Sequence, residues 1–412
     1  MPAEALKCKE CQAEFELGAS YVCDRCFGPL EVSYDHSGLD DPSELRRKIQ
    51  AGPPSIWRYI DFLPFDRRPR TGLDAGFTPL IRSERLAERL GVGEVWVKND
   101  AANPTHSFKD RVVNVAVAKA RELGFDVVAC ASTGNLANAV AAHAAAAGLD
   151  SYVFVPSDLE EQKILATGVY GTKLVAVRGN YDDVNRLCIE LSAEHPWAFV
   201  NVNLRPYYAE GSKTLAFEVA EQLGFELPDR VVCPVASGSL FTKIARGFEE
   251  WLDLGILAGS LPSFHGAQAE GCSPVAQAYE AGHEICRPVR PNTIAKSLAI
   301  GNPADGVFAL DVARRTEGSI DSVTDEEIVD GIRLLAETTG IFTETAGGVT
   351  TAVLAKLAER GDIGADDRVV LYITGDGLKT LDAVRGIVST YEVEPALDSF
   401  NETVPVSGGE RV

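Results

Sequence analysis

Strand-like and helix-like segments alternate along most of the chain, and this pattern limits the possible folds more than any other feature. The strand-like runs are short and apolar, and they lie at 94–100, 127–132, 151–156, 173–179, 197–203, 230–236, 263–271 and 368–377. Helix-like segments start at Lys109 and Asn135, lie near 160–168, 182–194, 209–224 and 239–253, and start again at Asp325 and Thr345. Strands that alternate with helices predict α/β domains with largely parallel sheets.

The ends of the chain differ from this pattern. Residues 1–35 hold two pairs of cysteines separated by aromatic and apolar residues, which predicts two short knuckles and a hairpin. Residues 36–75 are polar with proline clusters, so we expect a connecting arm with one short helix. Residues 395–412 are polar without periodicity, and we expect a mobile tail there. A chain of 412 residues has room for two substantial domains between these ends.

The overall charge limits the partners of the protein. The formal net charge is −21 at pH 7. Such an acidic chain is unsuited to nucleic acid, and an anionic substrate would need a locally positive pocket. There is no run of about 18 uncharged apolar residues, and the start MPAEALKCKE lacks the apolar stretch of a signal peptide. We therefore expect no membrane partner and a cytoplasmic location.

Four of the nine cysteines lie in the first 26 residues, as CKEC and CDRC. Four thiolates at this spacing suit a tetrahedral zinc ion, because each C-x-x-C turn brings two sulfurs to one metal. The predicted ligands are Cys8, Cys11, Cys23 and Cys26. The alternative is a ribbon that folds without metal. The other cysteines are single and mostly in apolar segments, which fits small buried side chains in a reducing compartment.

A lysine stands at the entrance of a predicted helix, in the stretch NPTHSFKDR at residues 103–111. The positive end of the helix dipole disfavours a cation there, so the amine of Lys109 suits a Schiff-base lysine, which works partly deprotonated. The alternative is an exposed lysine in a first turn, beside Asp110. We interpret Asp110 and Arg111 as structural residues that form an ion pair with each other.

Three loops rich in Gly, Ser and Thr follow predicted strands: 130–138 (CASTGNLAN), 234–243 (PVASGSLFTK) and 372–380 (YITGDGLKT). Ligands of open α/β sheets gather at the carboxyl ends of the strands, and the first N–H groups of a helix form a phosphate cradle. Each loop alone is weak evidence, since every strand-to-helix turn needs glycine and cap residues. Neither G-x-G-x-x-G nor a Walker A motif is present, which disfavours NAD and nucleotide triphosphates.

Together the loops and the lysine suit one cofactor that has a phosphate, a ring oxygen, a ring nitrogen and an aldehyde, namely pyridoxal 5′-phosphate. Lys109 would bind the aldehyde as a Schiff base, Asn135 would donate to the ring hydroxyl oxygen, and Thr374 would face the pyridine nitrogen. A neutral hydroxyl group beside this nitrogen favours elimination and replacement over transamination. The phosphate would lie on the backbone N–H groups of Ala236, Ser237, Gly238, Ser239 and Leu240.

Six stretches resemble a known family. NPTHSFKDR, ASTGN, EGSKTLAFEVAEQLG, TIAKSLAIGNP, TETAGGVT and ITGDGLK are similar to motifs of the threonine synthases, which belong to the fold-type II pyridoxal-phosphate enzymes. The resemblance covers about residues 75–390. It implies a homodimer and the conversion of O-phospho-L-homoserine and water into L-threonine and phosphate. It also implies two open α/β domains of the tryptophan synthase β-like kind with the cofactor between them, a large one at 76–100 and 209–394 and a small one at 101–208.

The sequence departs from the threonine synthase pattern around the substrate. His106 stands where glycine usually precedes Ser-Phe-Lys, and Leu136 stands where a hydroxyl residue often follows the asparagine. The basic residue common two positions before Glu-Gly is Tyr208, and the arginine common before IGNP is Ala299. The loop 236–240 reads ASGSL instead of a run rich in Gly and Asn. The resemblance therefore supports the cofactor site more strongly than the site of the substrate phosphate.

Other residues are predicted to contact the substrate. Arg205 and Lys296 are the predicted replacements that bind the substrate phosphate, with solvated surface charges as the alternative. Ser132 and Thr133 are expected to hold the substrate carboxylate through hydroxyl and backbone donors. Lys109 would be the general base that removes the α-proton and later a β-proton.

Three other functions stay open at this point. One is a replacement enzyme that acts on O-phosphoserine, like a cysteate synthase, and the changed residues around the substrate phosphate favour it. Another is a serine or threonine dehydratase, which shares the fold and the loops. The third is a zinc-ribbon binding module on an enzyme-derived scaffold, in which Lys109 would be dispensable.

Overall fold

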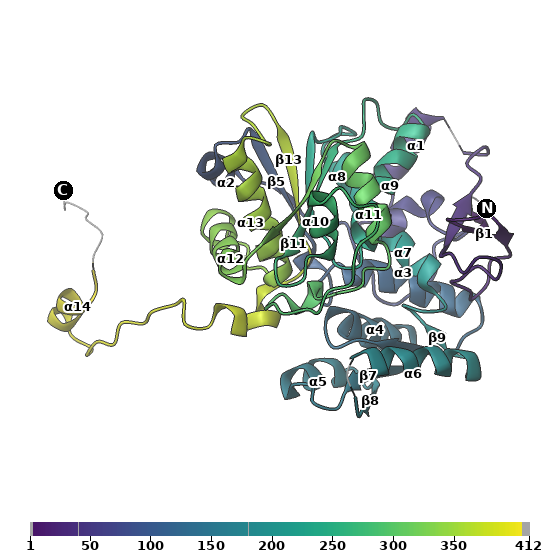
Figure 1. The fold of residues 1–412 in the computed structure, drawn as a ribbon, viewed down its shortest axis with the longest axis horizontal. Helices are drawn as coiled ribbons and strands as arrows, with labels where there is room; N and C mark the ends of the chain where they lie inside the picture. Colours follow the sequence, from purple (N-terminus) through teal and green to yellow (C-terminus); the bar gives the residue numbers. More distant parts are fainter. Residues whose placement is uncertain (1–2, 40, 180, 406–412) are drawn as a thin grey trace.

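Residues 3–39, 41–179 and 181–405 are described by the computed structural model, and they form three sheets with helices packed around them (Figure 1). The small N-terminal sheet lies at one end of the molecule, beside α7 (Arg205–Glu210), and the C-terminal segment leaves the opposite end. Among the helices described, none combines the length and the apolar character needed to cross a membrane.

The largest sheet has six strands in the order β12–β11–β10–β13–β5–β4. Every neighbouring pair is parallel except β4–β5, which is antiparallel. The central strands β10 and β13 are almost wholly buried, as expected for a parallel sheet covered on both faces. The bounds are β4 Leu80–Arg82, β5 Glu94–Asn99, β10 Arg230–Pro234, β11 Ser263–Ala269, β12 Ser319–Val323 and β13 Arg368–Ile373.

Two groups of helices cover this sheet. The first group shares an apolar core with β5 and β13 and consists of α2 (Glu84–Leu90), α12 (Asp325–Thr339) and α13 (Thr345–Arg360). The second group packs against β10 and β11 and consists of α8 (Thr214–Gln222), α9 (Ser239–Asp253), α10 (Pro274–Glu280) and α11 (Gly306–Arg315). The helix starts predicted at Asp325 and Thr345 and the helix predicted at 239–253 agree with these bounds.

The helix predicted at 209–224 is wrong in its bounds. α7 begins earlier, at Arg205, and a 3-10 turn, η3 (Gly211–Lys213), separates it from α8. The turn lies where Gly211 packs against α3 (Lys109–Glu122), since a Cβ atom on this glycine would lie 2.6 Å from the carbonyl oxygen of Arg111. Apart from the glycine itself, this contact between distant segments has no local sequence signal.

A second sheet has four parallel strands in the order β8–β7–β6–β9. Its strands are β6 Val127–Ala131, β7 Asp150–Pro156, β8 Lys173–Val177 and β9 Ala198–Phe199, so the run predicted at 197–203 is a strand only in its first half. The helices α4 (Asn135–Ala147), α5 (Glu161–Gly168) and α6 (Tyr181–Glu194) pack around it. α3 packs on α4 and is buried from Asp110 to Ala120, because its valines and alanines present an apolar surface on every side.

The N-terminal unit is an antiparallel sheet in the order β2–β1–β3, with β1 Ala3–Cys8, β2 Glu14–Phe15 and β3 Leu30–Tyr34. The arm expected at 36–75 contains α1 (Pro42–Gln50) and also a 3-10 segment, η1 (Ile56–Phe62). The prediction of one short helix is therefore incomplete. Ile56, Trp57 and Phe62 are buried in the cores of the body, so tertiary packing forms η1.

After β13 the chain forms a 3-10 segment, η5 (Gly377–Val384), and then runs away from the body (Figure 1). In the tail predicted at 395–412, Leu397–Thr403 form a short helix, α14, in which no side chain is buried. The prediction for residues 406–412 lies outside the described residues. Two further 3-10 turns, η2 (Asp100–Ala102) and η4 (Lys296–Leu298), lie in loops.

Candidate functional site

The loop that carries Lys109 is joined to the end of β13. The backbone N–H of Phe108 donates to the carbonyl oxygen of Thr374 at 2.9 Å, and Ser107 pairs with Gly375 in an isolated bridge. His106 has a positive φ of 63°, a conformation that glycine adopts without steric cost, which explains why glycine suits this position of the motif. These contacts place Thr374 next to the turn of the lysine.

Lys109 is the first residue of α3, and no side chain caps this helix. Its Nζ lies 3.0 Å from the hydroxyl oxygen of Tyr208, a residue of α7. The same nitrogen lies 4.5 Å from the centre of the Phe108 ring and 5.6 Å from the centre of the Tyr208 ring. The lysine is partly exposed, and a hydroxyl group rather than a carboxylate holds its amine.

Asn135 and Thr374 meet at a buried carboxylate that the sequence did not reveal, that of Glu344. The Asn135 amide nitrogen donates to Glu344 at 2.9 Å, and the Thr374 hydroxyl oxygen lies 3.5 Å from the same carboxylate. Glu344 directly precedes α13 and is 3% exposed. Burial raises the pKa of its carboxyl group, although Asn135 and two nearby amines oppose this shift.

Lys379 is a second residue of the site that sequence reasoning missed. Its Nζ donates to the Asn135 amide oxygen at 2.8 Å and to the carbonyl oxygen of Thr105. Burial lowers the pKa of its ammonium group. Glu344 lies in TETAGGVT and Lys379 in ITGDGLK, two motifs that carry the family resemblance, and this is the signal that would have found them.

The loop 236–240 joins β10 to α9. Gly238 has a φ of 99°, and no side chain caps α9, so the first N–H groups of this helix have no intrahelical acceptor. Asp305 holds the loop, since its N–H donates to the Ser237 carbonyl oxygen at 2.8 Å. A Cβ atom on Gly238 would lie 2.6 Å from the Asp305 carbonyl oxygen, so glycine is required here. The result is a partly exposed backbone cradle suited to a small anion.

Ser132 and Thr133 follow β6 in the turn that leads to Asn135. Ser132 is buried, and its hydroxyl oxygen accepts from the N–H of Gly134 at 3.4 Å. Thr133 is partly exposed, and no side chain caps the N-terminus of α4. The structure therefore places both predicted residues in one loop with Asn135, at a second uncapped helix start.

Arg205 and Lys296, the two residues predicted to bind the substrate phosphate, lie in different surroundings. The Arg205 guanidinium group pairs with the Asp305 carboxylate at 2.8 Å, and Asp305 holds the loop 236–240. Arg205 also stands one helical turn from Tyr208 on α7. Lys296 is exposed in η4, and none of the contacts among the described residues joins it to Lys109. The structure thus connects Arg205 to the loop through Asp305, whereas Lys296 stays a prediction.

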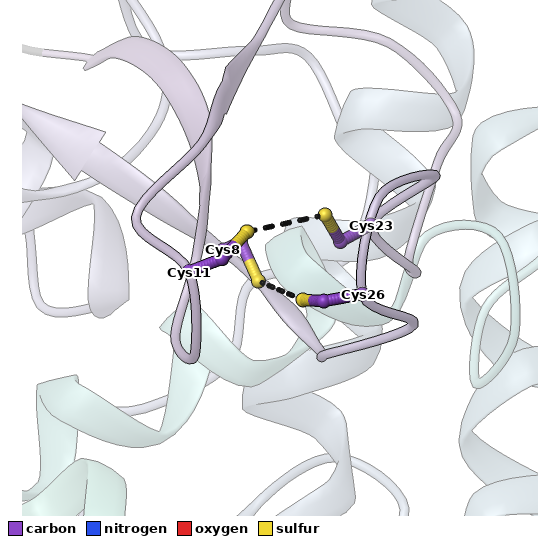
Figure 2. A group of neighbouring side chains, drawn as sticks. All are labelled: Cys8, Cys11, Cys23 and Cys26. Atoms are coloured by element: carbon purple, nitrogen blue, oxygen red, sulfur yellow. Dashed lines mark hydrogen bonds between the residues drawn. The ribbon is translucent and has the colours of Figure 1, made fainter.

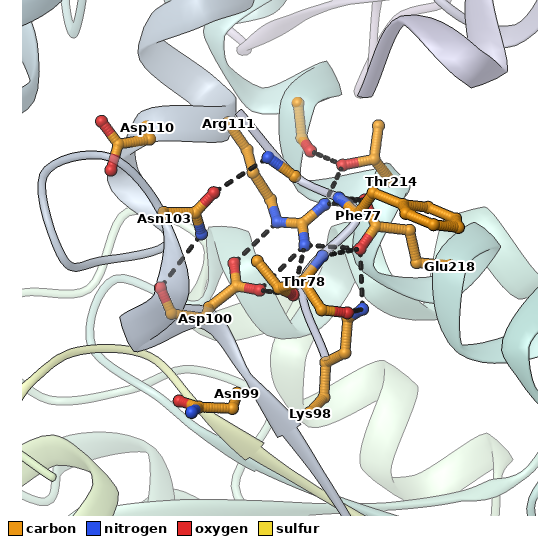
Figure 3. Close-up of polar contacts among 12 residues, drawn as sticks. Phe77, Thr78, Lys98, Asn99, Asp100, Asn103, Asp110, Arg111, Thr214 and Glu218 are labelled. Atoms are coloured by element: carbon orange, nitrogen blue, oxygen red, sulfur yellow. Dashed lines mark hydrogen bonds and ion pairs between the residues drawn. The ribbon is translucent and has the colours of Figure 1, made fainter. Parts of the chain in front are cut away.

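Arg111 anchors the helix of Lys109 in a buried cluster of charges (Figure 3). Its guanidinium group pairs with Asp100 at 2.6 Å and also with Glu218, which pairs with Lys98 at 2.7 Å. Burial would raise the pKa of Glu218, but Arg111 and Lys98 lower it to about 2. Because these side chains come from β5, η2, α3 and α8, the cluster fixes the lysine helix to the large sheet.

The ion pair predicted between Asp110 and Arg111 is wrong. The Asp110 carboxylate instead lies 2.9 Å from Nε2 of the buried His143, and it accepts from the Thr105 N–H at 2.9 Å. Consecutive helix residues point about 100° apart, so Asp110 faces α4 while Arg111 faces the charge cluster. Each of these two neighbours of Lys109 therefore anchors a different side of its helix.

The predicted metal ligands Cys8, Cys11, Cys23 and Cys26 converge in the N-terminal unit (Figure 2). All four are free thiols, and their sulfur atoms lie within 4.8 Å of one another. Cys8 and Cys26 are separated by 3.4 Å, and Cys11 and Cys23 by 3.6 Å. A tetrahedral ion with Zn–S bonds of about 2.3 Å separates its sulfurs by about 3.8 Å, so the cluster has the size of a zinc site.

The two C-x-x-C pairs form the same turn. The N–H of Gln12 donates to the Cys8 carbonyl oxygen at 3.1 Å, and the N–H of Phe27 donates to the Cys23 carbonyl oxygen at 3.0 Å. Both donors have a positive φ, 62° and 59°, which is unfavourable for side chains of this kind. The repetition of one strained turn is explained by a shared task, which is to direct two sulfurs to one point.

The residues around Lys109 fit the cofactor expected from the sequence. They offer an amine, an amide, a neutral hydroxyl group and an uncapped backbone cradle on different segments. In addition, the buried hydroxyl groups of Ser107 and Thr345, which adjoin Phe108 and Glu344 in the chain, have no hydrogen-bond partner in the described part of the protein. Unpaired buried polar groups are rare in proteins, and a bound ligand is one of their usual partners.

Comparison with known proteins identifies a family model and close relatives. The model described as "Pyridoxal-phosphate dependent enzyme" matches residues 72–375. A threonine synthase of Methanosarcina acetivorans is 40% identical over 403 residues, which cover 97% of this chain and 98% of that protein. A threonine synthase of Methanocaldococcus jannaschii is 39% identical, with 92% of this chain and 93% of that protein covered.

Solved structures show the same fold at low sequence identity. The processed form of threonine deaminase isoform 2 from Solanum lycopersicum superposes with a TM-score of 0.65 at 20% identity, over 94% of this chain and 93% of that chain. Maize serine racemase gives a TM-score of 0.63 at 19% identity, over 82% and 95%. These likenesses confirm the predicted arrangement of largely parallel α/β sheets, and at this identity they bear on the fold alone.

Proposed function

Because the chain belongs to the threonine synthases, a group of pyridoxal-phosphate dependent enzymes, we propose that it converts O-phospho-L-homoserine and water into L-threonine and phosphate. The similarity to threonine synthases extends over nearly the whole chain. The observation that carries our assignment of residues is the meeting of three segments at one place. The Lys109 turn, the end of β13 and the start of α4 are joined there by backbone pairing and by Glu344.

The cofactor explains the chemical groups at this place. When bound, pyridoxal phosphate supplies an aldehyde that bonds to an amine and a ring that withdraws electrons from the substrate. Lys109 would hold the aldehyde, Asn135 the ring hydroxyl oxygen and Thr374 the pyridine nitrogen. The loop 236–240 would hold the phosphate on its backbone N–H groups. Glu344 accepts a hydrogen bond from the Asn135 amide nitrogen, and Lys379 donates one to the Asn135 amide oxygen. These two bonds fix the orientation of the Asn135 side chain.

Lys109 moves the protons of the reaction. Its amine carries one proton at a time: it removes a proton from the α-carbon and later one from the β-carbon, phosphate leaves from the γ-carbon, water adds at the β-carbon, and the amine returns protons to the γ-carbon and the α-carbon. The amine stands at the uncapped start of α3, where the Tyr208 hydroxyl group holds it at 3.0 Å. Asp110 and Arg111 contribute by anchoring this first turn on both sides.

The anionic groups of the substrate are assigned to two places. Ser132 and Thr133 would hold the carboxylate, because the start of α4 offers backbone donors without a capping side chain. Arg205 would bind the substrate phosphate, since its partly exposed guanidinium group lies beside the loop 236–240. It would give up its ion pair with the Asp305 carboxylate and pair with the phosphate instead. Lys296 stays a prediction as a second cation for this phosphate.

The substrate separates this proposal from its alternatives. The purified holoenzyme is incubated with O-phospho-L-homoserine, O-phosphoserine, serine or threonine, and released phosphate, threonine and ammonia are measured. We expect equal amounts of phosphate and threonine from O-phospho-L-homoserine. A dehydratase would release ammonia from serine or threonine, and a cysteate synthase-like enzyme would release phosphate from O-phosphoserine alone. Either of these results without threonine formation contradicts the proposal.

We also propose that the cysteine cluster binds one structural zinc ion. Replacing Cys8 and Cys23 with serine should remove the metal and unfold residues 3–35, because so small a sheet depends on its metal for stability. Metal analysis and limited proteolysis of the holoenzyme check this, with Cys286→Ser as the matched control at a partly exposed cysteine outside the cluster. Protein that resists proteolysis and contains no metal would show that the ribbon folds alone.

The location and assembly expected from the sequence belong to the same proposal. All nine cysteines are free thiols, which supports the reducing environment of the cytoplasm. We propose a homodimer as the working form, and sedimentation of the holoenzyme tests it.

A further inference from the structure

Tyr208 makes a contact that the proposed function does not yet use. Its hydroxyl oxygen lies 3.0 Å from Nζ of Lys109, although the two residues are 99 positions apart in the chain. The ring of Tyr208 is partly buried and also faces the lysine, with 5.6 Å between the ring centre and Nζ. The family pattern commonly has a basic residue at this position, so the tyrosine is a departure of this sequence from that pattern.

Packing on both sides of Tyr208 fixes this contact. The preceding residue, Tyr207, is buried, and its hydroxyl group donates to the carbonyl oxygen of Gly18 in the N-terminal unit at 3.1 Å. Glu210, two residues after Tyr208, is also buried. Its carboxylate accepts a hydrogen bond from the Tyr34 hydroxyl group at 2.6 Å. Gly211 then packs directly on the carbonyl group of Arg111, two residues after Lys109. α7 and α3 are thus held in close contact, and the tyrosine and the lysine meet as a consequence.

The two protonation states of the lysine amine explain what the hydroxyl group does. The amine must be an ammonium ion after it accepts a proton from the substrate and a free amine before that. A phenol hydroxyl group accepts a hydrogen bond from an ammonium group and donates one to a free amine. An arginine or lysine would only donate and would repel the ammonium form, whereas a carboxylate would only accept and would stabilise that form. Tyrosine serves both protonation states and favours neither strongly.

We propose that Tyr208 is a catalytic residue that keeps the amine of Lys109 in place throughout the proton transfers. The proton taken from the substrate carbon stays on Lys109 until Lys109 returns it to carbon, and Tyr208 keeps its own proton. The hydrogen bond between them reverses direction when the amine changes its charge. This inference rests on the proposed function for its substrate, but the contact itself is independent of which phosphorylated amino acid reacts.

Two sets of variants test the inference on the holoenzyme. Tyr208→Phe keeps the ring contacts and removes the hydroxyl group, so we expect kcat for O-phospho-L-homoserine to fall about 10- to 100-fold with little change in KM. Tyr208→Arg should lower the pH midpoint of the visible absorbance change of the bound cofactor, and Tyr208→Glu should raise it, each by about one unit, because a charge beside the lysine nitrogen opposes or favours its protonation. Tyr279→Phe is the matched control, because it removes the hydroxyl group of a tyrosine on α10, outside the site, that donates to the Gly318 carbonyl oxygen, and it should leave kcat and the midpoint unchanged.

The outcomes separate this inference from the proposed function. The absorbance measurement uses no substrate, so it reports the contact between Tyr208 and Lys109 even where O-phospho-L-homoserine is not the substrate. A wild-type kcat in Tyr208→Phe, or midpoints that coincide in the Arg and Glu variants, would overturn the inference. If the wild-type enzyme forms no threonine, the proposed function is wrong. The absorbance midpoints of the variants then still test the contact between Tyr208 and Lys109. Cofactor content, measured for each variant, confirms that the variants compared are folded.

Discussion

Replacing Lys109 with alanine should lower threonine and phosphate release from O-phospho-L-homoserine by about 10³-fold or more, because the general base and the covalent attachment point are lost together. The fold should remain intact, since α3 is held by Arg111 and Asp110 and the lysine side chain itself is partly exposed. Phosphate release by the purified protein and circular dichroism measure the two effects. Lys163→Ala is the matched control, as this lysine is exposed on α5.

A chemical experiment identifies the same amine without relying on turnover. Borohydride reduction followed by digestion should place the reduced cofactor adduct on the peptide that contains Lys109. The Lys109→Ala protein should give no such peptide. An adduct on a peptide that contains another lysine, for example Lys379 near Asn135, would show that the assignment of the Schiff-base lysine is wrong.

Replacing Arg111 with methionine should lower the free energy of unfolding by about 3–5 kcal/mol, because it leaves the buried carboxylates of Asp100 and Glu218 without their main partner. Activity should fall as well, since the first turn of α3 carries Lys109. Urea unfolding of the holoenzyme, followed by circular dichroism, gives the change in free energy. Arg385→Met, which removes an exposed ion pair with Asp382, is the control and should change stability little. An equal effect of both changes would contradict the role of the cluster.

The pH dependence of stability gives an independent check on this cluster. Arg111 and Lys98 hold the pKa of Glu218 at about 2, against an ordinary value of 4.5. A carboxyl group with a lowered pKa stabilises the fold above pH 4.5, and this contribution is lost as the pH falls towards 2. The wild-type protein should therefore lose stability over this range, and Arg111→Met should lose less of it. Unfolding midpoints measured across the range decide between these outcomes.

Much of the fold follows from local patterns of residues. Period-2 and period-3.6 patterns are set by neighbouring residues, so the strands at 94–99, 230–234 and 368–373 and the helix at 239–253 could be read from the sequence. The same holds for the thiols of the N-terminal unit, because a C-x-x-C turn is a local structure. The break between α7 and α8 could not be read in this way, since it depends on the approach of Gly211 to Arg111.

The same distinction between local patterns and tertiary contacts applies to the candidate site. The sequence by itself determined that Lys109 stands at the start of a helix and that three loops with small residues follow parallel strands, because each of these is a property of a short stretch. It also carried the motifs that identify the family. The tertiary structure alone decided that Asp110 and Arg111 turn to different partners and that Arg205 pairs with Asp305, which holds the loop 236–240.

Only the tertiary structure brought Tyr208 to Lys109 and Glu344 to Asn135. These pairs are 99 and 209 positions apart. Such contacts arise where separate helices and strands pack together, and the position of one side chain then depends on the volume and shape of many others. A local pattern contains no record of that packing, so the chemistry next to the lysine became visible only in the folded protein.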